Sequence, residues 1–164
     1  MSYKPILCMD FDGVIHSYSS GWKGARNIPD PPVPGALDFL SAAETVFEVH
    51  IYSSRSHQFG GIRAMKRWLH AQTVAHINQI INENKDWASP GREAKYPTLR
   101  WINLDAHEPW DLMVREAADR FINAVYWPRH KPPAMISIDD RAMTFTGQWP
   151  TISSLQHFKP WNKK

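Results

Sequence analysis

Four short runs of apolar residues constrain the fold more than any other feature of this sequence. They cover residues 6–9, 46–52, 122–126 and 134–138, and their apolar residues follow one another with little polar interruption. A continuous apolar run of this length is typical of a parallel strand that is covered on both faces. We therefore interpret the four runs as strands of a buried parallel sheet.

Helical patterns lie between these runs. In residues 34–43 a proline precedes apolar residues at spacings of three and four, as at the start of an amphipathic helix. A similar pattern covers residues 60–69, and the apolar residues at 77–81 either extend that helix or start another. Residues 109–121 form a third pattern. Strands that alternate with helices in this way predict an α/β fold with a parallel sheet.

Length and composition indicate one globular domain over residues 1–164. The chain is 43% hydrophobic and 21% charged, which excludes disordered, collagen-like and coiled-coil proteins. No apolar run approaches the roughly 20 residues of a membrane span, and the N-terminus lacks a signal-peptide pattern. The single cysteine, Cys8, suits a reducing compartment. We expect a cytoplasmic protein without membrane contact.

Two stretches fit neither pattern. Residues 17–34 are rich in glycine, serine and proline, and we expect them to form a loop or hairpin flap. Residues 84–107 look like an irregular insertion. Long loops in compact domains are usually functional or mobile, so either stretch is a candidate cover for a binding site.

Carboxylates follow the first and last apolar runs, at the strand ends where open parallel sheets bind ligands. Asp10 and Asp12 are two residues apart, so they point to the same side of an extended chain and repel unless a cation or a proton intervenes. Asp139 and Asp140 would complete a site for Mg²⁺, which prefers carboxylate and phosphate oxygens. Gly13 allows a sharp turn beside the reacting group, and we predict it as one of the substrate-binding residues. The alternative is a solvated turn at the end of a strand.

Hydroxyl and cationic side chains complete this set. Ser53 and Ser54 follow the second run and would hold a phosphate oxygen, with Arg55 offering a fork of donors. Lys131 lies eight residues before Asp139. Each of these signals is weak alone, because serines end many strands and a lysine before a strand is usually solvated. In a shared crevice, Lys131 would neutralise crowded negative charge.

The order of these motifs resembles the haloacid dehalogenase-like (HAD) superfamily of phosphohydrolases. Residues 10–16 (DFDGVIH) are similar to its first motif, residues 52–55 resemble its second, and residues 131–142 resemble a compact third and fourth motif. The resemblance implies a Rossmann-like three-layer sandwich of the small, capless or minimally capped type. Lys131 departs from the usual pattern, because it leaves no room for a helix before the last motif.

The resemblance also implies a role for each matched residue. Asp10 would be the nucleophile that forms an aspartyl-phosphate, and Asp12 the general acid and base. Ser53 would bind the phosphoryl group and Lys131 would stabilise its charge. Magnesium would be held by Asp10, the main-chain carbonyl of Asp12, and the pair Asp139 and Asp140, of which we favour Asp139 as the direct ligand.

The substrate class stays open at this level. The short spacing between the first two motifs leaves little room for a cap, so we expect an open or lightly covered site. In the flap, Trp22, Lys23 and Arg26 combine an aromatic ring with cations, which suits a base and its phosphates, although packing and solvation explain them equally well. A net charge of +3 fits an anionic substrate.

Three functions remain in view. The leading one is a magnesium-dependent phosphomonoester hydrolase acting on a nucleotide, a polynucleotide end or a small phosphorylated metabolite. The second is a non-catalytic accessory protein that binds nucleic acid on the same fold. The third is a phosphotransferase or mutase. Such an enzyme needs to exclude water, so an open site argues against it.

Overall fold

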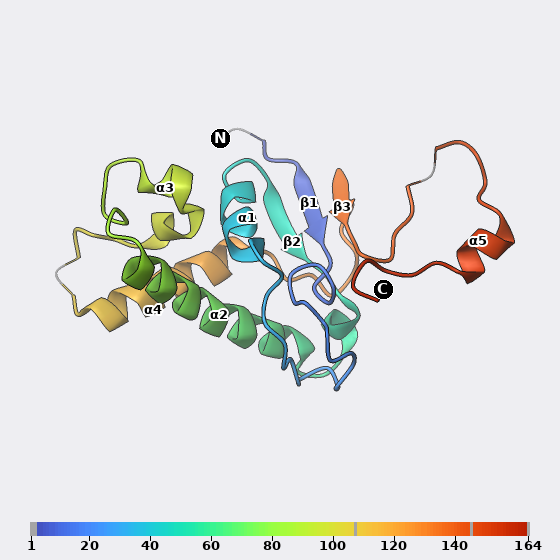
Figure 1. Ribbon diagram of the computed structural model, residues 1–164, viewed down its shortest axis with the longest axis horizontal. Coiled ribbons are helices and arrows are strands. Elements are labelled where there is room, and N and C mark those ends of the chain that lie inside the picture. The colour runs from blue at the N-terminus through green and yellow to red at the C-terminus, as the bar shows by residue number, and fades with distance from the viewer. Residues whose placement is uncertain (1–2, 107, 145, 164) are drawn as a thin grey trace.

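A parallel sheet of three strands forms the centre of the computed structural model, which describes residues 3–106, 108–144 and 146–163 (Figure 1). Strand β1 (Ile6–Met9) lies between β2 (Glu48–Ile51) and β3 (Ile136–Ile138). Met9 pairs with Ile51 on one side and with Ile138 on the other. The three carboxyl ends are therefore level, and the α/β class with a parallel sheet is confirmed.

The helices follow the predicted patterns closely. α1 (Ala36–Ala43) connects β1 to β2, and α4 (Trp110–Ala124) precedes β3. Residues 77–81 extend the second helix, so that α2 (Gly61–Glu83) is one helix of 23 residues. The short elements are the 3-10 helices η1 (Ser54–His57) and η2 (Pro97–Trp101) and the helices α3 (Arg92–Lys95) and α5 (Ile152–Gln156).

The main core lies on one face of the sheet. Leu7, Met9, Val49 and Ile51 share that face, and they form one cluster with buried residues of α1, α2 and α4. On the opposite face the Tyr126 ring stacks on His50 at 4.7 Å between ring centres. In the described part of the chain the packed helices thus cover one face, so the two helical layers of a three-layer sandwich are not seen.

The predicted strand at 122–126 is wrong. Ile122–Ala124 forms the last turn of α4 instead, and only Tyr126 makes a parallel bridge, to His50. The physical reason is that Ile122 follows the buried Ala118 by four residues and so continues the buried face of α4. A short apolar run does not distinguish a strand from the end of a buried helix.

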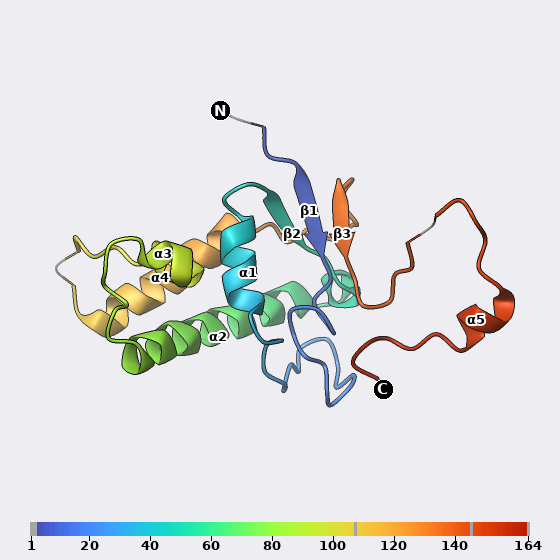
Figure 2. The ribbon, with the colours of Figure 1, turned by 45° about the horizontal axis from the view of Figure 1, so that its top comes forward.

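The irregular insertion was predicted for residues 84–107, of which the last lies outside the described residues, and residues 84–106 are more ordered than predicted. They include α3 and η2, and Leu99 and Ile102 are buried in a second core cluster with Ile77 and Ile80 of α2. Figure 2 shows this part beside the end of α2 that lies away from the sheet. The insertion therefore extends the core.

The flap and the C-terminal segment approach the same end of the sheet. Residues 17–34 contain no helix or named strand, as predicted. Beyond β3 the chain runs outward through α5 and then returns (Figures 1 and 2). There Trp161 Nε1 donates a hydrogen bond of 2.8 Å to the Gly13 carbonyl. The sequence analysis did not predict this contact.

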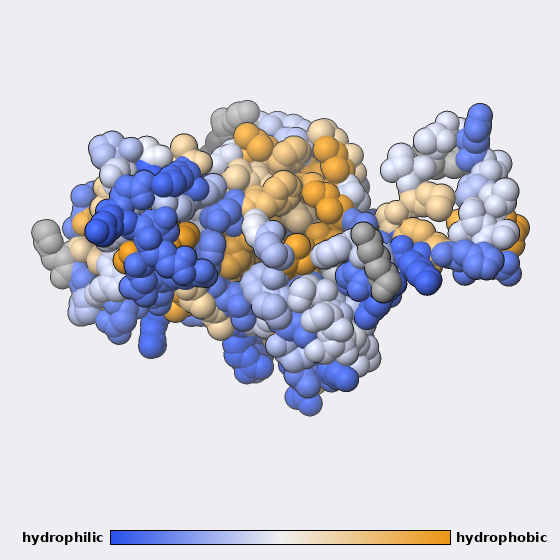
Figure 3. Space-filling view, viewed as in Figure 1, coloured by the Kyte–Doolittle hydropathy of each residue, from blue (hydrophilic) through white to orange (hydrophobic). Residues whose placement is uncertain are grey.

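The outer edge of the sheet carries exposed apolar side chains. Met135, Ile136 and Ile138 are all exposed, and Figure 3 shows apolar surface over the middle of the molecule, where the strands lie. Among the described residues, no helix is both long enough and apolar enough to span a membrane.

Candidate active site

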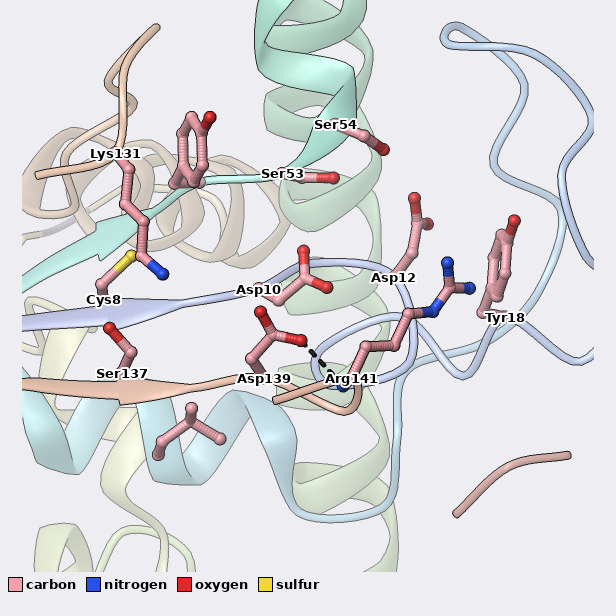
Figure 4. A pocket seen from close by; sticks show the side chains of 12 residues that line it. Cys8, Asp10, Asp12, Tyr18, Ser53, Ser54, Lys131, Ser137, Asp139 and Arg141 are labelled. Carbon is pink, nitrogen blue, oxygen red and sulfur yellow. Dashed lines mark hydrogen bonds between the residues drawn. The ribbon is translucent and has the colours of Figure 1, made fainter. Parts of the chain in front are cut away.

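A cavity of about 220 Å³ opens at the carboxyl ends of the three strands (Figure 4). Because the strand ends are level, residues that are far apart in the sequence meet there. Five of the predicted site residues line this cavity, together with Asp139 of the predicted metal site. These five are Asp10, Asp12, Ser53, Ser54 and Lys131.

Asp10 is held rigidly at the end of β1. Its backbone N–H donates to the Ile138 carbonyl at 2.9 Å, and its Oδ1 accepts from the Phe11 backbone N–H at 2.7 Å. Burial raises the pKa of Asp10, the Phe11 hydrogen bond lowers it, and the nearby carboxylates of Asp139 and Asp140 raise it again, to about 7 overall. In the absence of a cation, this carboxylate is destabilised in its charged form.

Three carboxylates form a cluster beside it. Asp10, Asp139 and Asp140 each place an oxygen within 4.8 Å of the others. The Asp140 side chain is fully buried, and neither of its oxygens accepts a hydrogen bond from a described residue. Burial raises the pKa of Asp140, although Arg141 Nε lies 3.8 Å from its Oδ2. Buried carboxylate oxygens without donors are costly unless a cation contacts them.

This arrangement fits a magnesium ion. Mg²⁺ binds to hard oxygen ligands, with one or two carboxylates supplemented by water or phosphate oxygens. Asp139 lines the cavity and is exposed, while Asp140 lies behind it. The side chain of Asp12 does not join the cluster, as expected if Asp12 contributes through its main-chain carbonyl.

Asp12 has partners of its own. His16 Nδ1 donates to Asp12 Oδ1 at 2.9 Å, and Arg55 Nε donates to Asp12 Oδ2 at 2.8 Å. The Asp30 backbone N–H donates to His16 Nε2, which assigns the proton of a neutral imidazole to Nδ1. Burial raises the pKa of Asp12, but the hydrogen bonds from His16 and Arg55 outweigh it and lower the pKa overall. Asp12 is therefore ionised in the free protein.

Arg55, which we predicted to offer a fork of donors to a phosphate, does not line this cavity. Its side chain is fully buried, and its guanidinium stacks on the Trp22 ring at 4.6 Å from the ring centre. Its Nη1 donates to three carbonyls of the flap, those of Gly24, Ala25 and Asn27. Arg55 thus joins the flap to Asp12 through Nε and Nη1, while its buried Nη2 has no hydrogen-bond partner among the described residues.

The two serines lie at the entrance to η1. Ser53 is buried, and its Oγ accepts from the Arg55 backbone N–H at 3.3 Å while its own N–H donates to Ser56 Oγ. Ser54 is exposed and lines the same cavity. Figure 4 shows both serines above Asp10 and Asp12, with Lys131 on the far side next to Cys8. Two hydroxyls and one ammonium therefore face the carboxylates across the cavity.

Besides Arg55, four other predicted substrate-binding residues do not line the cavity. Gly13 has a φ of +87°, and a Cβ there would collide with Asp140 Oδ2, so the glycine lets the turn pass close to the carboxylate. Trp22 packs on Arg55. Lys23 and Arg26 line a separate hollow of the surface.

The sequence analysis missed several residues of the site. Cys8 and Ser137 line the cavity and stand two residues before Asp10 and Asp139, so strand alternation was a usable signal for them. The other lining residues missed were Tyr18, Tyr52, Ile138 and Arg141. His16 was missed as the buried partner of Asp12.

The sequence matches no protein-family model, and neither a curated protein nor a solved structure matches the chain. The functional argument therefore depends on the geometry and chemistry of the residues described above.

Proposed function

We propose that the protein is a magnesium-dependent phosphomonoester hydrolase that works through an aspartyl-phosphate on Asp10. The observation that carries the proposal is the buried carboxylate of Asp140, which accepts no hydrogen bond from a described residue, beside Asp10 and Asp139 at a cavity that Ser53 and Lys131 also line. A carboxylate cluster that faces hydroxyl and ammonium groups suits a cation and a phosphate together.

In the first step, an Asp10 carboxylate oxygen attacks the phosphorus atom and forms a P–O bond. The bond between phosphorus and the ester oxygen breaks, and the leaving oxygen takes a proton from Asp12. In the second step, water attacks the same phosphorus atom and gives a proton to Asp12. Phosphate leaves and the Asp10 carboxylate is restored.

The free protein holds Asp12 in the protonation state that the second step needs, and substrate binding favours the state that the first step needs. Its lowered pKa makes it a carboxylate in the free protein, ready to accept a proton from water. A bound phosphate dianion places negative charge beside Asp12 and raises its pKa, so substrate binding favours the protonated form that the first step needs. His16 and Arg55 keep the carboxylate oriented throughout.

Ser53, Ser54 and Lys131 would hold the phosphoryl oxygens. Charge-assisted and hydroxyl donors placed where negative charge develops are the main source of catalysis in phosphoryl transfer. Asp10, Asp139, Asp140 and the Asp12 carbonyl would hold the magnesium ion. When bound, the ion supplies positive charge that offsets the cluster and polarises a phosphoryl oxygen.

The HAD-like assignment belongs to the same proposal. It is supported by the order of the motifs along the chain and by the meeting of their residues at one end of a parallel sheet.

The test is hydrolysis of para-nitrophenyl phosphate with magnesium and with EDTA. We expect metal-dependent turnover that falls by at least about a thousandfold in Asp10→Asn, since loss of a nucleophile removes most of the rate enhancement. Asp111→Asn, an exposed position in the first turn of α4, is the matched control. Full activity in Asp10→Asn would contradict the assignment of the nucleophile.

A further inference from the structure

Net positive charge is concentrated in three segments of this chain that contain no acidic residue. Residues 18–29, 52–82 and 121–138 together contain eight of the 19 lysines and arginines and none of the 16 acidic residues. The rest of the chain consequently has an acidic excess of five, although the whole chain has a net charge of +3. The three segments are the flap, η1 with most of α2, and the stretch from the end of α4 to β3.

These segments meet in space. The Arg26 side chain of the flap packs against Gly60, just before α2. Lys66 Nζ of α2 lies 5.8 Å from the centre of the Trp127 ring, and the rings of His57 and His130 lie 5.9 Å apart. The segments therefore form one continuous surface around η1 and the start of α2.

Two hollows lie side by side on this surface. Lys23 and Arg26 line one of them, and Arg63, Lys66 and Arg129 line the other. Phe59 lines both and is 92% exposed. We call this set of six side chains the basic surface. Within the described residues, none of its five cations forms an ion pair with a carboxylate, so their charge is available to an anionic partner.

The basic surface continues into the candidate active site. Tyr52 lines the catalytic cavity, and its hydroxyl lies 2.7 Å from Nε2 of His57, which lines the second hollow. Lys131, on the wall of the cavity, is two residues from Arg129. A chain of anions bound on the basic surface would thus lead to Asp10.

We propose that the basic surface binds a single strand of nucleic acid whose terminal phosphate enters the cavity. The inference rests on the proposed function and names its substrate class. Spaced cations that are free of carboxylates match a repeated phosphate backbone, and an exposed aromatic ring among them offers a stacking platform for a base. A small phosphorylated metabolite fills the cavity alone and has no use for this surface.

The binding test uses fluorescein-labelled single-stranded oligonucleotides with a terminal phosphate, measured by fluorescence anisotropy in EDTA across a salt series. We expect the affinity of the wild-type protein to fall steeply with salt. Arg63→Gln with Arg129→Gln should weaken binding by about tenfold or more at low salt. The slope of log K against log salt should shrink by about 1.4, since each phosphate contact on a single strand contributes about 0.7.

A matched control removes the same charge elsewhere. Lys85→Gln with Arg115→Gln changes two exposed cations outside the basic surface, and we expect affinity within about twofold of wild type. Phe59→Ala should weaken binding by about fivefold with an unchanged salt slope, because stacking is not electrostatic. Equal loss in both double variants would overturn the proposal, since it would show attraction to net charge alone. So would stronger binding of a phosphopeptide of similar charge.

The design separates the two proposals. If para-nitrophenyl phosphate is hydrolysed but the oligonucleotide does not bind, the inference is wrong and the phosphatase proposal stands. The phosphatase proposal is wrong if the oligonucleotide binds at the basic surface and, with magnesium, neither para-nitrophenyl phosphate nor the terminal phosphate of the oligonucleotide is hydrolysed. The protein would then be the non-catalytic nucleic-acid-binding alternative.

Discussion

Replacement of Arg55 by methionine tests how the flap and the site depend on each other. Arg55 and Asp12 form a buried ion pair, with 0% and 9% of their side chains exposed and 2.8 Å between Nε and Oδ2. Removing one partner of such a pair costs about 3–5 kcal/mol, because the other charge stays buried. For a chain of this size each kcal/mol lowers Tm by about 2–4 °C. We therefore expect Arg55→Met to lower Tm by about 6–20 °C.

Urea unfolding followed by tryptophan fluorescence measures this loss. Arg115→Met, at an exposed position on α4, is the control and should change the free energy of unfolding by no more than about 0.5 kcal/mol. If Arg55→Met does not fold, Arg55→Lys is the substitute, because it keeps one charged donor. Its loss of free energy of unfolding should lie between the loss expected for Arg55→Met and that of Arg115→Met. An effect of Arg55→Met as small as that of Arg115→Met would refute the buried ion pair.

The same experiment has a defined pH dependence. Burial raises the pKa of Asp12, but His16 and Arg55 lower it overall, so the unfolded state binds more protons at acidic pH. The stabilisation is present above the pKa of an unfolded aspartate, about 3.9, and is lost as pH falls through the lower folded value. The difference between wild type and Arg55→Met should therefore narrow below about pH 4. An undiminished difference there would show that Asp12 is not the relevant partner.

Two further predictions concern the carboxylate cluster of Asp10, Asp139 and Asp140. Since burial and the neighbouring carboxylates raise the pKa of Asp10 to about 7, magnesium competes with a proton below that pH; calorimetry should show a larger magnesium-induced rise in Tm at pH 8 than at pH 6. Asp10→Asn should remove this difference, and an equal rise at both pH values in the wild-type protein would contradict the raised pKa. Gly13→Ala forces a side chain onto a φ of +87° and against Asp140 Oδ2, so we expect a loss of about 1–3 kcal/mol in urea unfolding. Its magnesium-induced rise in Tm should also be smaller, and a variant as stable as wild type would show that the turn tolerates a Cβ.

The local sequence pattern was sufficient to predict much of the fold. The apolar runs at β1, β2 and β3 and the helical spacings of α1, α2 and α4 are properties of neighbouring residues. Parallel strands bring their carboxyl ends to one edge of a sheet, so Asp10, Ser53 and Asp139 were predicted to meet without any long-range information. The error at 122–126 has the same origin, because a short apolar run fits a strand and a helix end equally well.

The charge pattern along the chain is also visible in the sequence, but the sequence does not show that the charged segments form one surface. The acid-free stretches are visible in the sequence, whereas the contacts of Arg26 with Gly60 and of Lys66 with Trp127 make them one surface. The flap cations Lys23 and Arg26 were predicted to bind substrate, and only the structure shows that they line a hollow beside the catalytic cavity.

The sequence by itself determined which residue types stand at the ends of the strands. Only the tertiary structure decided what each charged group contacts. Arg55 turns inward to Asp12 and three flap carbonyls, and Trp161 returns to Gly13 from the far end of the chain. A buried charge or polar group takes whatever partner the packing places beside it. Those partners here lie up to 148 residues away, beyond the reach of any local pattern.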